Sequence, residues 1–487
     1  MSDALVRNQP PSVDPGPLRL AVVGESPGIE EQHWATCASG HGFSTRHWLN
    51  RSLVARDRCA VCGTRDWKPS PKPFVGESGR LLNDLLAECG LTRERVYVGN
   101  CSRFPLSEGE KRVENCTGSL AVLNMELEEF RPNCVLVLGN LALHAFHPRA
   151  EEAKIGDWRG SIFEGKVSGS LGPTFKCVAA LHPAAVLREP SQLALLRKDV
   201  QRAVDDAKDA ALDLPEVVVD APASAEEVCA KLKTIRDARL PVGFDIEGGC
   251  DVGVTVLSFA TSPTRTLSIP FKRLNWSSVW SKDDELGIQM DARAVLEDAA
   301  VPKICHNSAY EMFCLAWLHG VTMVNVEDTM IAWAALLPEL ERGLDTVASL
   351  LTRQPHWGKA GDWATDEERD TYNAIDSCVT LECWQNMQPL FSAEQRAYYE
   401  TQRSLLEPVV AMMLRGFRFD AEARDDMRYT IGKEVLALSG ELDELAGIPL
   451  PSFREVAETV AMKVKLPQVV DWPDIVRFAK PSYREGL

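Results

Sequence analysis

Residues 18–28 read LRLAVVGESPG, an apolar run that ends directly in a glycine- and proline-containing turn. Two later stretches have the same form, CVLVLGN at residues 134–140 and KCVAALHP at residues 176–183. Amphipathic patterns typical of helices, such as SGRLLNDLLAECG, lie between them. Strands that alternate with helices predict a parallel α/β sheet. Ligands of such a sheet bind at the carboxyl ends of the strands.

The composition indicates a folded protein of several domains. The chain has 487 residues, 45% of them hydrophobic and 25% charged, which suits two or three domains. No apolar run approaches the roughly 20 residues that span a bilayer, so we expect no membrane association. Fourteen cysteines without the spacing of small secreted domains predict a reducing, cytoplasmic setting. The net charge of −17 argues against a non-specific nucleic-acid coat but permits a local basic groove.

Changes in composition along the chain predict its domain boundaries. Residues 1–17 are polar and rich in proline, which predicts disorder. A first α/β domain follows at 18–204, and an acidic, Ala/Pro-rich linker at 205–225. A second α/β domain occupies 226–392, and a helical tail occupies 393–487.

Short blocks of the first domain occur in a fixed order. They are GESPG at 24–28, KPFVGESGRLLNDLL at 72–86, VYVGN at 96–100, LGNLAL at 138–143, RG at 159–160 and LHPAAVLR at 181–188. In order and spacing these blocks resemble the family 4 and related uracil-DNA glycosylases over residues 18–204. Ordered blocks are more specific than one glycine motif. Singly, GESPG also suits a plain strand-to-helix turn, Phe74 a core aromatic and His182 a turn histidine.

The resemblance implies a pocket for a uracil flipped out of DNA. Phe74 would provide the stacking floor, and the Asn100 amide would match the donors and acceptors of the uracil edge. His182 would donate to the uracil carbonyl that becomes anionic. Glu25 would position water or stabilise the cationic sugar. The implied phosphate-binding and gap-filling groups are Gly24, Pro27, Gly28 and the loop 183–187 that begins with Pro183.

Two departures from those relatives restrict the resemblance. Family 4 enzymes carry four cysteines for an iron–sulfur cluster. Here no cysteine precedes Cys37, Phe104 stands near an expected ligand position, and only Cys116 matches, so we expect no iron–sulfur cluster. The segment after Asn100 lacks a histidine, which argues against the relatives that trap uracil covalently.

An insertion at 33–68 carries closely spaced metal-ligand residues. Its C-x3-H and C-x2-C halves supply Cys37, His41, Cys59 and Cys62. Three thiolates and one imidazole suit a structural, tetrahedral Zn²⁺. His47 is an alternative ligand to His41, although GHGF resembles zinc-ribbon sequence. A surface loop with incidental cysteines is the other interpretation.

The second domain contains three pairs of residues whose spacing suits two-metal chemistry. Asp245 and Glu247 alternate on a predicted strand in PVGFDIEG, whose hairpin partner reads TVLSFAT, so both face one side. Asn307 and Glu311 in HNSAYEMFCL, and Tyr372 and Asp376, are four apart on predicted helices. A pair of divalent ions that cleaves a phosphodiester needs about four such carboxylates.

Together with VEDTMIAWAALLP and LDTVASLL, these pairs resemble the tyrosine subtype of DEDD 3′-5′ exonucleases in family A DNA polymerases. The resemblance implies a ribonuclease H-like fold. Asp245, Glu247, Glu311 and Asp376 would hold two Mg²⁺ or Mn²⁺ ions, and Tyr372 would orient the attacking water. The implied substrate contacts are Asn307 and Tyr310. Glu311 stands where the family usually has Asp, and a dead site or ordinary surface acids remain alternatives.

The tail sequence LLEPVVAMMLRGFRFD and the residues that follow resemble the start of a family A polymerase thumb. Palm and fingers motifs are absent from the sequence, so we expect no polymerase activity. A helical cap on the exonuclease is the alternative. The sequence as a whole predicts a DNA-binding, two-site repair and replication enzyme of a bacterial or phage-infected cell. Its expected partners are uracil-containing or single-stranded DNA, a separate polymerase chain and other replisome proteins. The competing hypothesis is a non-catalytic subunit that senses uracil or DNA ends.

Overall fold

The structure is a computed structural model that describes residues 5–446 except 33, 45, 50–51, 56–57, 60, 63, 148–152 and 419. The chain divides into two compact units, Met1–Leu414 and Arg415–Leu487. Both α/β domains lie in the first unit. A search of the described helices finds none with the length and apolar character of a membrane span.

The first domain is built on a five-stranded sheet in the order β7-β1-β8-β10-β9. Its strands are β1 (Leu20–Gly24), β7 (Tyr97–Asn100), β8 (Cys134–Leu138), β9 (Ile162–Gly165) and β10 (Phe175–Ala180). All are parallel except β9, which pairs antiparallel with β10. The chain leaves β1 toward β7 and later returns to β8 on its other side, so β1 lies at a topological switch point.

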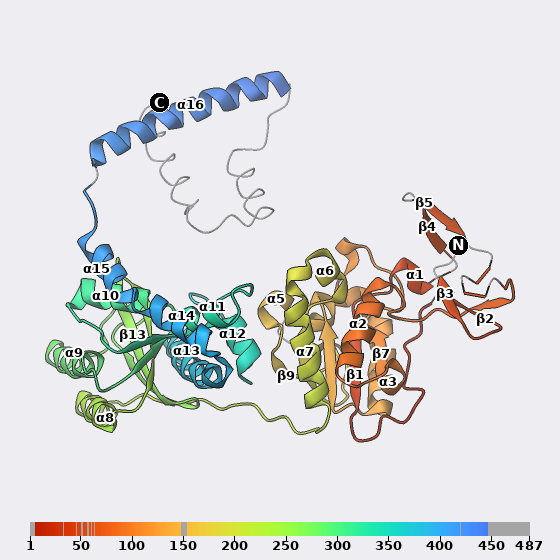
Figure 1. Cartoon of the computed structure of the whole chain (residues 1–487), viewed down its shortest axis with the longest axis horizontal. Helices are drawn as coiled ribbons and strands as arrows, with labels where there is room; N and C mark the ends of the chain where they lie inside the picture. The colour runs from red at the N-terminus through yellow and green to blue at the C-terminus, as the bar shows by residue number, and fades with distance from the viewer. Residues whose placement is uncertain are drawn as a thin grey trace. The chain divides into compact units, whose positions relative to one another are not determined.

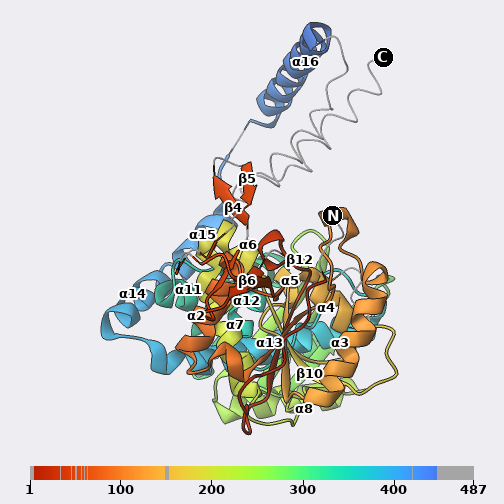
Figure 2. The same cartoon turned by 90° about the vertical axis from the view of Figure 1, so that its right-hand side faces the viewer.

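Helices cover both faces of this sheet, as Figure 2 shows. Alternate residues of β1 point to opposite faces, with Leu20 and Val22 in one core and Ala21 and Val23 in the other. The helices on the first face are α2 (Glu77–Glu88), α6 (Pro183–Arg188) and α7 (Leu193–Asp206), and those on the second are α3 (Thr117–Phe130) and α4 (Asn140–Phe146). Burial on both faces explains why these strands are apolar without alternation.

The N-terminal segment differs from the expectation of disorder over 1–17. From residue 5 it packs along the sheet edge, with Val6 buried and Gln9 paired with Val98 through backbone hydrogen bonds. Asn8 Oδ1 accepts a hydrogen bond from the backbone N–H of Asn100 at 3.1 Å. This segment therefore supports the end of β7.

The insertion after α1 (Ile29–Gln32) forms two small antiparallel sheets. One contains β2 (Trp34–Cys37), β3 (Gly42–Ser44) and β6 (Trp67–Pro69). The other is a hairpin of β4 (Arg46–Leu49) and β5 (Ser52–Ala55). The side chain of His47, the alternative zinc ligand, lies outside the described part of the insertion.

The second domain has a six-stranded sheet in the order β11-β14-β13-β12-β15-β16. The strands are β11 (Val218–Asp220), β12 (Val242–Gly249), β13 (Gly253–Ser262), β14 (Arg265–Pro270), β15 (Lys303–Cys305) and β16 (Val326–Asp328). β12, β13 and β14 form an antiparallel meander, and β15 and β16 continue parallel to β12. This is a ribonuclease H-like arrangement. β11 lies inside the segment 205–225 that the sequence predicts as a linker, so part of that segment belongs to the sheet.

One face of this sheet packs on α8 (Ala225–Ala238), α9 (Lys282–Leu296) and α10 (Ala309–His319). The other face packs on the long helix α13 (Asp366–Met387). A Cβ added to Gly243 would lie 2.1 Å from the carbonyl oxygen of Ser377. Because β12 has a glycine there, α13 can approach closely and place Asp376 beside the acids of β12.

The helices α11 (Thr329–Leu336), α12 (Leu344–Leu351) and α14 (Ala393–Arg403) share a core around Trp333 and Tyr399. α15 (Leu406–Arg415) packs on the second domain through Leu406 and Val410. The 26-residue helix α16 (Ala421–Ala446) belongs to the second unit and is drawn in blue in Figure 1. The predicted thumb-like residues beyond α16 lie outside the described chain.

A disulfide joins Cys250 and Cys314, with Cα atoms 5.1 Å apart. It ties the turn after β12 to α10. The sequence analysis, which expects a reducing setting, does not anticipate this bridge.

Candidate functional site

The first candidate pocket forms where β1 and β7 end side by side, with Gly24 in register with Asn100. A Cβ added to Gly24 would lie 2.4 Å from Cζ of Phe74 and 2.7 Å from Oδ1 of Asn100. Only a glycine at this position lets the ring and the amide approach the strand end together. Three residues from distant sequence blocks therefore lie together at the carboxyl ends of β1 and β7.

Phe74 faces His182 in this pocket. Their ring centroids are 5.7 Å apart and the rings are inclined by 28°, which is a stacked arrangement. Phe74 is 2% exposed and has a backbone φ of +52°, which is unusual for a bulky side chain. Its backbone is held from both sides, because its N–H donates to Glu31 and its carbonyl accepts from Arg93 at 2.8 Å. Such a strained conformation persists only where the surroundings fix it.

Glu31 connects the ring to the amide. Its Oε1 accepts the N–H of Phe74 at 2.9 Å, and its Oε2 accepts from Nδ2 of Asn100 at 3.4 Å. Burial raises the pKa of Glu31 to about 7, against the hydrogen bonds and Arg93, which lower it. The sequence analysis missed both Glu31 and Arg93, because only the fold brings them to Phe74.

His182 lies at the N-cap of α6, where its Nδ1 accepts the N–H of Ala184 at 3.1 Å. Since Nδ1 is an acceptor, the proton of the neutral ring is on Nε2. Burial lowers the pKa of His182 to about 4, so the ring is neutral at pH 7 and Nε2–H is a donor. The predicted loop 183–187 is wrong: these residues are the first turns of α6, with Pro183 buried and Leu187 45% exposed.

Glu25 lies directly after β1 and has two partners. Its Oε2 forms an ion pair with Nζ of Lys111 at 2.9 Å, and its Oε1 accepts the N–H of Leu141 at 3.3 Å. Lys111 comes from the segment after Asn100, and the sequence analysis did not identify it. In the same turn, Pro27 is buried and Gly28 is exposed.

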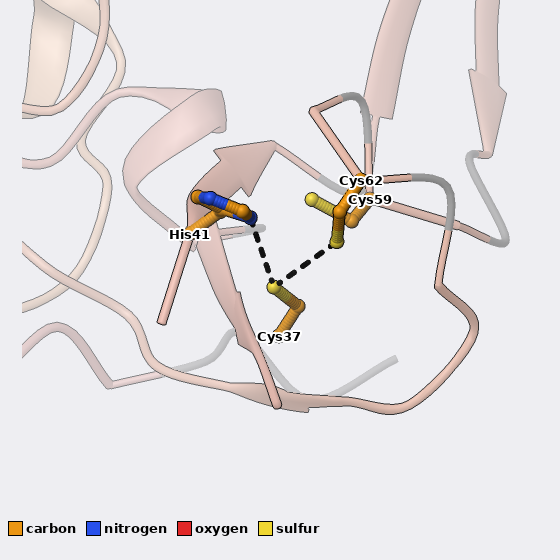
Figure 3. A group of neighbouring side chains, drawn as sticks. All are labelled: Cys37, His41, Cys59 and Cys62. Atoms are coloured by element: carbon orange, nitrogen blue, oxygen red, sulfur yellow. Dashed lines mark hydrogen bonds between the residues drawn. The ribbon is translucent and has the colours of Figure 1, made fainter. Parts of the chain in front are cut away.

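The four predicted zinc ligands lie together in the insertion (Figure 3). The ligand atoms of Cys37, His41, Cys59 and Cys62 are all within 4.8 Å of one another. Sγ of Cys37 is 3.7 Å from Sγ of Cys62 and 3.6 Å from Nδ1 of His41. Thiolates on a tetrahedral Zn²⁺ with bonds of about 2.3 Å would be about 3.8 Å apart. This cluster can hold a metal ion.

The second candidate site is a cluster of acids between β12 and α13. Carboxylate oxygens of Asp245, Glu247 and Asp376 lie within 4.8 Å of one another. Burial raises the pKa of Asp245 well above its usual value, and the charges of Asp376, Glu311 and Glu247 raise it further. Burial and the charge of Glu247 likewise raise the pKa of Asp376, and burial raises that of Glu247 to about 7. Buried like charges at this distance repel one another, so the cluster favours bound cations.

Neutral donors hold two of these carboxylates. Nδ2 of Asn373 donates to Asp245 at 2.6 Å, and the indole N–H of Trp357 donates to Asp376 at 2.7 Å. The hydroxyl of Tyr372 also lowers the pKa of Asp376, so the predicted water-orienting residue lies beside the cluster. The sequence analysis did not identify Asn373 or Trp357.

Glu311 lies near this cluster but outside its group of three. It is 3% exposed in the first turn of α10, and its Oε2 has no hydrogen-bond partner among the described residues. Its charge nevertheless contributes to the raised pKa of Asp245. Tyr310 donates from its hydroxyl to the carbonyl of Gly248, directly after Glu247. Asn307 precedes α10 with a backbone φ of +66°.

Comparisons with known proteins concern mainly the first domain. The Uracil DNA glycosylase superfamily matches residues 10–208. A Type-4 uracil-DNA glycosylase of Archaeoglobus fulgidus is 35% identical over 135 residues, which are 26% of this chain and 63% of that protein. A Type-4 uracil-DNA glycosylase of Thermotoga maritima is 30% identical over 138 residues, which are 28% of this chain and 67% of that protein.

The chain belongs to the uracil-DNA glycosylase superfamily. We call the domain built on the five-stranded sheet, which extends to the end of α7 at Asp206, the glycosylase domain. The domain built on the six-stranded sheet is called the ribonuclease H-like domain. The chain spans somewhat less than two thirds of the A. fulgidus relative. Among solved structures, the POL domain of Pol1 from M. smegmatis has a TM-score of 0.36 at 15% identity, with 48% of this chain and 38% of that chain covered.

Proposed function

We propose that this chain excises uracil from DNA. The observation that carries the proposal is that Phe74, Asn100 and His182 meet in one pocket at the switch point of the sheet. A base extruded from DNA needs a stacking surface and groups that read its edge. The Asn100 amide offers both a donor and an acceptor to the uracil edge.

His182 supplies the transition-state interaction. When the bond between N1 of uracil and C1′ of the sugar breaks, both bonding electrons leave with uracil. The resulting negative charge spreads onto the carbonyl next to N1. A neutral Nε2–H donor stabilises that oxygen more than the ground-state carbonyl, which lowers the barrier. Glu25, held by Lys111, faces the opposite charge on the sugar and positions the water that adds to C1′.

A single-stranded oligonucleotide with one uracil tests this activity, and the same strand with thymine is the control. Uracil-dependent abasic sites that form in the presence of EDTA are expected, because the pocket reads the base with protein groups. Abasic sites are detected by alkaline cleavage. If His182→Ala and Asn100→Ala both retain wild-type excision, the assignment of this pocket is wrong.

We further propose a metal-dependent 3′-5′ exonuclease in the ribonuclease H-like domain. The supporting observation is the group of Asp245, Glu247 and Asp376, whose oxygens can share divalent ions. The unpartnered Oε2 of Glu311 and the repulsion among buried carboxylates fit cations in this position. Mg²⁺ or Mn²⁺ would supply charge neutralisation and an activated water. The protein would hold the ions and orient that water through Tyr372, while Asn307 and Tyr310 contact the strand.

The matching assay follows shortening of a 5′-labelled strand with Mg²⁺, with Mn²⁺ and with EDTA. Loss of nucleotides from the 3′ end only with metal is expected. Shortening that persists in Asp245→Ala would show that another site, or a contaminant, performs it.

We propose that the cluster of Cys37, His41, Cys59 and Cys62 holds a structural Zn²⁺. Among the side chains that the structure describes in this insertion, the buried apolar cluster consists of Ala35, Cys37 and Cys59, so a metal would supply stability. Elemental analysis should find one Zn²⁺ per chain and less in Cys62→Ser. Equal zinc in the variant would exclude this site.

A polymerase partner is a further part of the proposed function, in a cytoplasmic, bacterial or phage-infected setting. Its support is the thumb-like tail sequence and the exposed apolar side chains of α16, which include Ile431, Leu438 and Leu445. Primer extension by a separately expressed family A palm-and-fingers chain should increase when this chain is added. Unchanged extension would favour the helical-cap interpretation.

A further inference from the structure

The segment between α12 and α13, residues 352–363, contains no helix or strand and contacts both domains. We call it the strap. Its contacts within the ribonuclease H-like domain are concentrated at the acid cluster. Trp357 donates to Oδ1 of Asp376 at 2.7 Å, and Trp363 packs on Tyr372 with ring centroids 5.6 Å apart. A Cβ added to Gly358, which has a φ of +112°, would lie 3.9 Å from the Tyr372 ring.

The strap is fastened to the glycosylase domain just before Trp357. Both carboxylate oxygens of Asp206, at the end of α7, accept from Arg353 at 2.9 and 3.2 Å. The carbonyl of Thr352 accepts from Arg202 at 2.8 Å. The Asp206 carboxylate is almost fully buried, so this is a charge-assisted, two-bond contact rather than a loose surface pair.

A second set of contacts fastens the strap on both sides of Trp357. The N–H of His356 donates to Oγ of Ser161 at 2.9 Å, and its ring packs on Trp158 with centroids 5.2 Å apart. Lys359 forms an ion pair with Asp157 at 2.8 Å. Asp157 and Trp158 belong to the short helix α5 (Ile155–Trp158) of the glycosylase domain. Residues 356 and 359 thus face one domain, while residue 357 faces the other.

We propose that Trp357 is a positioning residue for Asp376, and that the glycosylase domain completes the exonuclease metal site by holding the strap. This inference rests on the proposed exonuclease function. A donor that orients a metal-binding carboxylate fixes which oxygen faces the ion. The indole N–H donates to Oδ1 of Asp376 and so fixes how this carboxylate faces the acid cluster. Because the strap has no regular hydrogen-bonded structure of its own, the fastening contacts set where the indole lies.

Direct Mn²⁺ binding, measured calorimetrically on the full chain, tests the positioning role without requiring activity. Heat that is present in the wild type and absent in Asp245→Asn defines the exonuclease site. Trp357→Phe keeps the ring but removes the donor. Loss of such an outer partner typically weakens metal affinity by roughly 10- to 100-fold, and we expect a change in this range. Uracil excision and the melting temperature should stay unchanged.

Asp157→Asn tests the contribution of the other domain, because it alters only the glycosylase side of the contact. A several-fold loss of Mn²⁺ affinity is expected, and adding Lys359→Ala should cause little further loss, since both changes break one pair. Asp205→Asn is the matched control: it removes the pair with Lys208, and although Asp205 adjoins Asp206, its side chain bonds Lys208 and Gln201 and not the strap. Its Mn²⁺ affinity should equal that of the wild type.

Two results would overturn the inference: wild-type Mn²⁺ affinity in Trp357→Phe, or an effect of Asp157→Asn no larger than that of Asp205→Asn. Either would leave the strap as a purely structural link between domains. These results differ from failure of the proposed exonuclease, in which the wild type itself would show no Mn²⁺ binding that depends on Asp245.

Discussion

The charged side chains of the two candidate sites are compensated in different ways. In the glycosylase pocket each charged group has a protein partner: Glu25 has Lys111, and Glu31 accepts from Phe74 and Asn100, while His182 is neutral. In the ribonuclease H-like domain, Asp245, Glu247 and Asp376 face one another, and the hydrogen-bond donors that hold them are neutral. The charges of the first site are compensated within the protein, whereas those of the second would be compensated by the divalent ions proposed to bind there.

Asp245→Asn should separate the two proposed activities most strongly. Loss of metal-based charge stabilisation, worth several kcal/mol, should reduce 3′-5′ shortening about a thousandfold. Uracil excision should stay at the wild-type rate, because the proposed excision step uses only protein groups. Parallel assays on one protein preparation check both values, and a fall in excision would mean that the two sites are not chemically independent.

His182→Ala should give the reverse pattern. Removal of one donor to a developing anion costs roughly 10²- to 10³-fold in rate, while shortening should be unaffected. Since the pKa of His182 is about 4, its protonation should not alter excision between pH 5 and pH 8. A rate that falls as pH rises through a midpoint near 6.5, in the wild type and also in Glu31→Gln, would instead indicate an exposed histidine that acts as a cation.

Glu31→Gln tests whether the glycosylase pocket carries a stability cost. The folded protein holds the Glu31 proton up to about pH 7, whereas the unfolded chain releases it near pH 4.5. Between these values the folded state binds more protons, so the stability of the wild type falls as pH rises. Relative to Glu31→Gln, the loss should be on the order of 3 kcal/mol and complete above pH 7.

Urea unfolding of both proteins at several pH values checks this difference. The change with pH carries the test, because glutamine also alters the hydrogen bonds to Phe74 and Asn100 by a constant amount. Parallel pH profiles for the two proteins would contradict a raised pKa for Glu31.

Glu311→Asp should have the smallest effect. Aspartate is the acid usual at this position in the exonucleases that this domain resembles. Mg²⁺ requires nearly ideal octahedral placement of its ligands. We expect Mg²⁺-supported shortening to increase a few-fold, with less change for Mn²⁺. The ratio of rates with the two ions measures this, and a loss of activity with both would show that the longer side chain is needed.

Sequence reasoning found the side chains that lie within motifs at strand ends. Phe74, Asn100 and His182 were identifiable because each adjoins a short block, and the parallel sheet then brings those blocks together. Asp245 and Glu247 were identifiable because alternate residues of a strand share one face. Asp376 was identifiable because it lies four residues after Tyr372 on one face of a helix. The hairpin of β12 and β13 was also identifiable, because two apolar stretches follow each other closely in the sequence.

The residues that sequence reasoning missed act through packing between distant segments. Glu31, Arg93 and Lys111 support the pocket from a helix, a turn and a loop with no shared spacing. Trp357 lies 19 residues before Asp376, and only the path of the strap brings the two together. The β11 strand was missed because three residues in an acidic, Ala/Pro-rich stretch give too short a pattern.

The absence of a side chain at Gly24 limits how the base preference of this site can be changed. Because Gly24 has no side chain, the Phe74 ring and the Asn100 amide, which we propose to bind the base, both fit there, so any substitution displaces both at once. Selection or engineering therefore cannot adjust shape recognition and edge recognition separately from this strand. Substitutions at His182 and at the exposed residues of α6 are therefore the better starting points for a variant directed at another damaged base.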